Sequence, residues 1–125
     1  MGVTLTDPLD HPWFELNYRG MISPQELNEA LDSITEQALQ NGKRRILADC
    51  RELQGGHSSA DLLRLVERFD STAMGRSFRE AVLVQEGMAA DAVRFYETVC
   101  RNRGFQVRVF SERSAAESWL DQFSQ

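Results

Sequence analysis

Residues capable of chemistry are concentrated in one short stretch of the 125-residue chain, Gly-Gly-His-Ser-Ser-Ala-Asp at positions 55–61. His57 is a potential base, Ser58 and Ser59 carry hydroxyl groups, and Gly55 and Gly56 let a ligand approach the backbone closely. A helical apolar pattern begins directly afterwards, and the N–H groups at the start of a helix can hold an anion. The stretch therefore predicts a binding site at the start of a helix.

The same letters also have a purely structural interpretation, which the sequence favours. Ser58 can cap the helix, and Asp61, three residues later, can complete a capping box with it. The glycines would then only permit a tight loop. The anion-binding interpretation needs additional positive charge, which Arg51 or His57 would supply, and a phosphorylated serine would also suit the positive end of the helix.

Nucleophilic catalysis would require a serine or cysteine with a base in reach and an acid that orients the base. Ser58 or Cys50 can be combined with His57 and Asp49, but residues adjacent in the sequence rarely point at one another productively. No Gly-x-Ser-x-Gly, Walker, Gly-x-Gly-x-x-Gly or His-Glu-x-x-His motif is present. We therefore expect a protein that is not an enzyme and has no catalytic residues.

Metal or cofactor binding is not indicated either. The two cysteines, Cys50 and Cys100, are far apart, and only His11 and His57 are available to join them. Neither a disulfide framework nor a zinc site is predicted from this spacing. We expect no cofactor and no metal site, and reduced cysteines fit a cytoplasmic protein.

The elements that must position these residues alternate between strands and helices. Strands are predicted at residues 3–5, 13–18, 45–49, 81–84 and 105–110. Helices are predicted over residues 24–41, over the stripe Leu62, Leu65, Val66, Phe69 and Ala73, from Gly87 to about residue 102, and over the stripe Ala116, Trp119, Leu120 and Phe123. The fold class is α/β, with a small mixed, mainly parallel sheet of four or five strands, about four helices and an antiparallel pair at one edge.

Polar side chains follow the central strands of this predicted sheet. In open α/β sheets, ligands gather outside the carboxyl ends of the parallel strands, where these side chains meet. The candidate ligand- or partner-binding residues are Asp49, Arg51, Gly55, Gly56, His57, Ser58 and Ser59.

Composition indicates a single domain spanning residues 1–125, with 42% hydrophobic and 26% charged residues. The net charge of −5 and the pI near 5.0 argue against nucleic acid as a partner, because a phosphate-backbone binder normally carries a basic stripe. No apolar run approaches the roughly 18 residues of a membrane-spanning helix, and the first residues lack the pattern of a signal peptide.

Three segments carry a family resemblance, namely Phe-Glu-Leu-Asn-Tyr-Arg-Gly at residues 14–20, Arg-Ile-Leu-Ala-Asp at 45–49 and Phe-Gln-Val-Arg-Val-Phe at 105–110. With Ala116 and Trp119-Leu120 after them, they resemble the bacterial SpoIIAA-like proteins, also described as STAS/SEC14-domain proteins, from about Trp13 to Leu120. The resemblance implies a mixed sheet with helices, used for protein–protein regulation in STAS relatives and for holding lipid in SEC14 relatives. It also implies that Ser58 and Ser59 occupy the place of a phosphorylated serine, although the usual Asp-Ser-x-Gly pattern is missing here.

The expected function is a non-enzymatic binding or regulatory module that acts through protein–protein interaction, with an unidentified protein partner or as a homodimer. The alternative is a small-molecule or lipid-binding carrier of SEC14 type. The two differ physically, because a carrier needs an apolar cavity between sheet and helices, whereas an interaction module needs a filled core and an exposed apolar patch.

Overall fold

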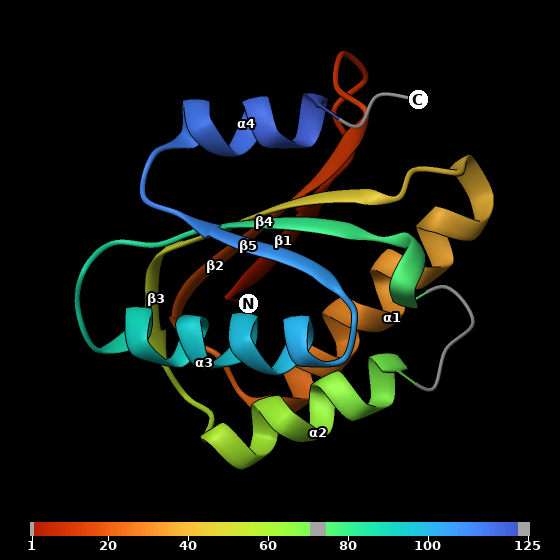
Figure 1. The fold of residues 1–125 in the computed structure, drawn as a ribbon. Coiled ribbons are helices and arrows are strands. Elements are labelled where there is room, and N and C mark those ends of the chain that lie inside the picture. Colours follow the sequence, from red (N-terminus) through yellow and green to blue (C-terminus); the bar gives the residue numbers. More distant parts are fainter. Residues whose placement is uncertain (1, 71–74, 123–125) are drawn as a thin grey trace.

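The sheet has five strands in the order β1-β2-β3-β4-β5. The computed structural model, drawn in Figure 1, describes residues 2–70 and 75–122. The strands are β1 (Val3–Thr6), β2 (Trp13–Met21), β3 (Arg45–Gly55), β4 (Arg79–Leu83) and β5 (Gln106–Phe110). β1 runs antiparallel to β2, and the other neighbouring pairs are parallel. The mixed, mainly parallel sheet and its antiparallel edge are therefore confirmed.

The central strands β3 and β4 pair in parallel, as their apolar sequences predict. Ile46 lies opposite Glu80, and Ala48 lies opposite Val82. Successive side chains alternate between the two faces, so Ile46 and Ala48 join one core and Leu47 joins the other. A strand buried on both faces needs apolar residues at consecutive positions, which explains its uninterrupted apolar run.

β2 and β3 extend beyond their predicted ends at residues 18 and 49. β4 pairs with β3 only as far as Asp49, and the rest of β3 continues along β2. In this extension Leu53 is buried while Arg51 and Glu52 are exposed. The polar residues look like a loop in the sequence, but a strand with a solvated face needs apolar residues on one side only.

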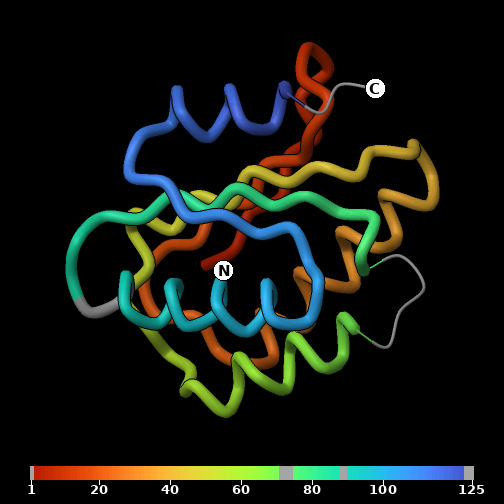
Figure 2. Tube along the Cα trace, in the orientation of Figure 1, coloured from red at the N-terminus to blue at the C-terminus, as the bar shows by residue number. Residues whose placement is uncertain are grey.

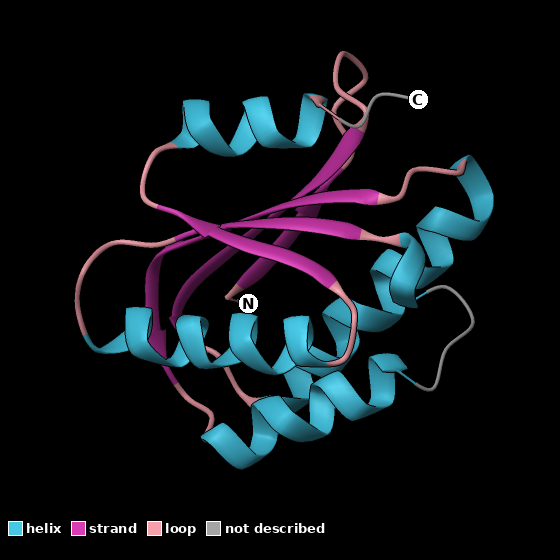
Figure 3. Ribbon diagram, viewed as in Figure 1, coloured by secondary structure: helices cyan, strands magenta, loops and turns pink. Residues whose placement is uncertain are grey.

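Among the described residues, four α-helices cover the two faces of the sheet unequally (Figures 1 and 3). α1 (Pro24–Asn41), α2 (Ser59–Asp70) and α3 (Met88–Asn102) lie on one face, and α4 (Arg113–Asp121) lies on the other. The blue trace of α4 is separated from these three helices by the sheet in Figure 2. A short 3-10 helix, Gly75–Ser77, precedes β4. Ala73 and Phe123, predicted on helical stripes, lie outside the described residues.

Each face of the sheet has its own apolar core. The larger core, between the sheet and helices α1 to α3, includes Phe14, Ile34 and Val66. The smaller core, beneath α4, is formed by Trp13, Leu47, Ala81, Leu83, Ala116 and Leu120. α2 packs against both α3 and α1. The space beneath α2 is where the candidate site lies.

α1 begins and ends as its sequence predicts. The Ser23 hydroxyl accepts a hydrogen bond from the Glu26 N–H at 3.1 Å, and the Glu26 carboxylate accepts one from the Ser23 N–H at 3.0 Å. Pro24 follows in the first turn, and Gly42 ends the helix at a φ of +81°. These caps fix where the chain leaves β2 and returns to β3.

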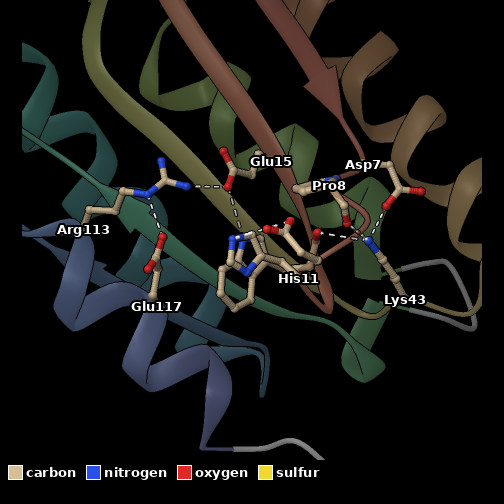
Figure 4. A network of polar contacts seen from close by, with 9 residues as sticks. Asp7, Pro8, His11, Glu15, Lys43, Arg113 and Glu117 are labelled. Carbon is tan, nitrogen blue, oxygen red and sulfur yellow. Dashed lines mark hydrogen bonds and ion pairs between the residues drawn. The ribbon is translucent and has the colours of Figure 1, made fainter.

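Polar contacts fasten the β1–β2 turn and α4 to the sheet (Figure 4). Lys43, just before β3, forms an ion pair with Asp7 in the turn. Arg113, in the first turn of α4, forms ion pairs with Glu15 of β2 and with Glu117. The ion pair with Glu15 ties α4 to β2 on the face opposite the candidate site.

The outer edge of β5 is partly covered by a side chain from α3. The Val109 N–H donates a hydrogen bond to the Glu97 carboxylate at 3.0 Å. Edge strands otherwise present unpaired backbone groups to solvent. Glu97 therefore satisfies one of these groups within the same chain.

Candidate functional site

A pocket of about 60 Å³ lies between the sheet and helices α1, α2 and α3. A second pocket of about 50 Å³ shares part of its wall. The shared wall consists of Tyr18, Leu27, Leu65, Glu80 and Tyr96. Outside this shared wall, every lining residue of the two pockets except His57 is apolar, so the two adjoining spaces form one largely apolar site.

A carboxyl group and two phenols meet in this apolar wall. The Tyr96 hydroxyl donates a hydrogen bond to Oε1 of Glu80 at 2.6 Å. Burial raises the pKa of Glu80 to about 7, and the hydrogen bond from Tyr96 partly opposes that shift. Burial, followed by the charge of Glu80, raises the pKa of Tyr18 and of Tyr96 well above the ordinary value. Both phenols are therefore neutral hydrogen-bonding groups at neutral pH.

An irregularity in the sheet lies beside Tyr18. The pairing advances by two residues on β2, from Asn17 to Arg19, but by three on β3, from Asp49 to Glu52. Such a β-bulge bends a strand and re-aims its side chains, and bulges are frequent next to functional sites. β3 accordingly curves toward the start of α2 (Figure 1). Leu53, near the end of β3, lines the pocket.

The residues predicted from the sequence fall into two separate groups. Asp49 points to the same face as Leu47, which is the face that α4 covers, and Arg51 follows it in the β-bulge. They bind one another, with Arg51 Nη2 at 2.9 Å from Asp49 Oδ2, and this hydrogen bond lowers the pKa of Asp49. His57 lines the pocket on the opposite face. The structure therefore does not bring Asp49 together with His57.

The predicted gathering of polar residues at the carboxyl ends of the strands is present as a shallow depression. It has a volume of about 250 Å³, and Arg51, Gln85, Glu86 and Gly87 are among the residues that line it. Ser58 and Ser59 are not part of its lining. The seven candidate residues therefore do not form a single site.

Gly55, Gly56 and His57 hold the residue that follows β2. The Ile22 N–H donates to the Gly55 carbonyl at 2.7 Å, and His57 Nδ1 lies 2.9 Å from the Ile22 carbonyl oxygen. Gly56 has a φ of +104°, and a Cβ there would lie 2.5 Å from Ile22 backbone atoms. These glycines therefore permit the close approach of the protein's own backbone.

Ser58 and Asp61 form the predicted capping box. The Asp61 N–H donates to the Ser58 hydroxyl at 3.1 Å, and the Ser58 N–H donates to the Asp61 carboxylate at 2.8 Å. That backbone hydrogen bond is also the main cause that lowers the pKa of Asp61. A carboxylate already occupies part of the positive end of α2, so the geometry supports the cap over the anion site.

Replacing Ser58 with alanine should lower the free energy of unfolding by about 0.5–2 kcal/mol, because the Asp61 N–H loses its acceptor. Ser59→Ala is the matched control, since Ser59 is exposed and begins the helix proper. Urea denaturation of both variants measures the difference. Equal stability of the two variants would show that the Ser58 hydroxyl does not cap α2.

Cys50, one of the nucleophiles weighed above, is buried in the larger core. Burial raises the pKa of its thiol far above the ordinary value, and it raises the pKa of the Cys100 thiol to about 12. A thiol is nucleophilic only as the thiolate, so both groups are poorly reactive here. Cys50 and Asp49 also point to opposite faces of β3.

Tyr18 and Glu80 were missed by the sequence analysis. The strand around Glu80 was predicted to begin one residue later, at Ala81, which left Glu80 in a loop. A signal was present, because an acidic residue that alternates with Ala81 inside a doubly covered strand must face the helices. Tyr18 was placed on the correct strand, but nothing in the sequence pairs it with Glu80.

Over residues 2–70 and 75–122, no group of three or more histidine, cysteine or acidic side chains is arranged to hold a metal ion. Within the same residues, no helix has both the length and the apolar character that crossing a membrane requires.

Comparison with known proteins identifies relatives by sequence and by fold. The sequence model of the SpoIIAA-like family matches residues 13–121. No curated protein matches the chain. A similar solved structure is that of an uncharacterized protein from the DUF3478 family with a SpoIIAA-like fold, from Shewanella loihica PV-4, at 22% sequence identity and a TM-score of 0.61. The similarity covers 94% of this chain and 91% of that chain, and it shows a shared fold.

Proposed function

The chain belongs to the SpoIIAA-like family, and from that premise we propose that it is a non-enzymatic module that binds a small, largely apolar molecule bearing one polar group. The main support for this proposal is the hydrogen-bonded pair of Glu80 and Tyr96 in the wall of a largely apolar pocket. An apolar pocket with a few convergent polar groups and a perturbed pKa is the usual form of a ligand site.

The size of the pocket limits the ligand. Drug-sized ligands occupy roughly 300–1,000 Å³, whereas the two spaces here measure about 60 and 50 Å³. A complete lipid would not fit without movement of α2. The proposal is therefore narrower than the lipid carrier considered from the sequence, and a ligand with a short apolar chain fits best.

Two measurements test this proposal. Native mass spectrometry of freshly purified protein should reveal a retained small mass. Titration with 1-butanol, followed by the methyl resonances of Leu65 and Val82, should give saturable shifts, because both side chains line the pocket. The methyl groups of Leu47, in the opposite core, should not shift. Absence of saturable shifts at Leu65 and Val82 would contradict the proposal.

Filling the pocket should abolish binding. Ala92 lines the pocket and is only partly buried, so Ala92→Met should weaken 1-butanol binding at least tenfold and raise stability by about 0.5–2 kcal/mol, as cavity-filling changes commonly do. Ala115→Met, the same change at an exposed position of α4, is the control. If Ala92→Met binds 1-butanol as tightly as the wild type, then 1-butanol binds outside this pocket.

Protein–protein contact, the function expected first from the sequence, is retained as a second candidate on one observation. The Met21 side chain is 66% exposed at the end of β2 and lies beside Gly55. Exposed methionines are common at protein-binding surfaces. A homodimer without any retained small mass in native mass spectrometry, dissociated by Met21→Ser, would favour this candidate over the pocket.

A further inference from the structure

We infer that the polar group of the ligand is a primary amine, bound as its ammonium ion against Glu80. This inference rests on the proposed function, because it assigns the chemistry of the ligand in the same pocket. It follows from the charges, the open hydrogen-bonding positions and the apolar surface of the wall.

The wall carries an acid without a matching base. Glu80 is the only acidic residue among the described residues that line the two pockets, and none of those residues is lysine or arginine. A carboxylate in an apolar wall gains most from a positive partner, because desolvation strengthens the attraction. An anionic ligand would instead place a second negative charge beside the first.

The hydrogen bonds leave an acceptor open at this carboxylate. Tyr96 donates to Oε1 of Glu80, and no residue in the described part of the chain donates to Oε2. An ammonium ion has three N–H donors and no acceptor, so it matches a site of open acceptors. The Tyr18 hydroxyl oxygen and the aromatic rings of Tyr18 and Tyr96 add further favourable contacts for a cation.

His57 fits the same assignment. Its Nδ1 lies 2.9 Å from the Ile22 carbonyl oxygen, so Nδ1 carries the proton of that hydrogen bond. The other nitrogen of the neutral ring is then an acceptor. A neutral His57 ring therefore adds an acceptor, and no free donor, to the residues that line the pocket.

The other residues of the pocket wall determine the apolar part of the ligand. Leu62, Leu65, Val82 and Val93 line the pocket around Glu80 and offer no hydrogen bonds from their side chains. An aliphatic chain of a few carbon atoms would displace water from these apolar surfaces. A short alkylamine is the simplest molecule that meets both requirements.

The test compares three probes of equal chain length by titration of the methyl resonances of Leu65 and Val82. n-Butylamine should bind at least tenfold more tightly than 1-butanol, and butyrate should not bind measurably. Binding of 1-butanol equal to or tighter than that of butylamine, or binding of butyrate, would overturn the inference and leave the proposed pocket intact. Failure of all three probes would overturn the proposed function itself. n-Decylamine distinguishes a short free amine from the amine of a longer, lipid-like chain. If the natural ligand has a long chain, n-decylamine should bind more tightly than n-butylamine; if it is a short amine, n-decylamine should not.

Glu80→Gln tests the role of the charge directly. Glutamine keeps a carbonyl oxygen for Tyr96 but removes the negative charge, so the ratio of butylamine to butanol affinity should fall at least tenfold. Glu29→Gln removes the same charge from an exposed position of α1 and should leave this ratio unchanged. An unchanged ratio in Glu80→Gln would overturn the assignment.

Discussion

Replacing Gly56 with alanine should lower the free energy of unfolding by about 3 kcal/mol or more, among the largest effects of a single substitution. Two causes act together. The φ of +104° disfavours any residue with a Cβ, and that Cβ would lie 2.5 Å from the backbone of Ile22. Ile22 is fully buried and bonded to Gly55 and His57, so its backbone cannot easily move away.

Gly55→Ala separates these two causes. Gly55 also has a positive φ, of +130°, but a Cβ there would meet only the flexible end of Met21, at 3.9 Å. Backbone strain alone should lower the stability of this variant by roughly 1–3 kcal/mol. Urea denaturation of both variants gives the comparison. A Gly56→Ala variant no less stable than Gly55→Ala would mean that the contact with Ile22 is not rigid.

The stability of the wild-type protein should fall as the pH rises from about 4.5 to 8, because Glu80 loses its proton over this range. The folded pKa of Glu80 is about 7, above its ordinary value of 4.5. Between these values the folded state retains a proton that the unfolded state releases, so stability is highest at the acidic end of the window and decreases toward its upper end. The full effect is about 3 kcal/mol at 1.4 kcal/mol per pH unit.

Glu80→Gln should remove most of this dependence. The variant should be more stable than the wild type by about 2–3 kcal/mol at pH 8 and about equally stable at pH 5. The titratable groups whose pKa is raised by the charge of Glu80 are Tyr18, Cys50, Tyr96 and Cys100, and their raised pKa values keep them neutral throughout this range. Urea midpoints at pH 5, 6.5 and 8 measure the slope, and Glu29→Gln is the surface control. Parallel slopes in the wild type and Glu80→Gln would show that Glu80 titrates normally.

The fold was predictable because local signals and apolar periodicity agree. Ser23 and Pro24 mark the start of α1 by capping chemistry that needs no tertiary context. The apolar runs of β3 and β4 predict a doubly covered pair, and the structure pairs them in parallel. The later parts of β2 and β3 were not predicted, because the exposed residues Arg51 and Glu52 hide a strand with one solvated face.

The candidate site was predictable only in part, because its members depend on pairing between distant strands. Gly55 and Gly56 were predicted either to let a ligand approach or to permit a tight loop, and the structure places the backbone of Ile22 against them. Glu80 and Tyr18 meet only through the register of β2 with β3 and of β3 with β4. No local pattern contains that register, so of the residues that line the pocket the sequence analysis named His57 as a candidate and not Tyr18, Glu80 or Tyr96.

The carboxylate that Glu97 places on the Val109 N–H has a consequence for self-association. A second copy that extended the sheet by adding its own strand beside β5 would have to displace Glu97 and would then face its negative charge. Growth into a continuous intermolecular sheet is thus hindered at this side. If two copies pair, helices or the opposite border of the sheet must supply the contact.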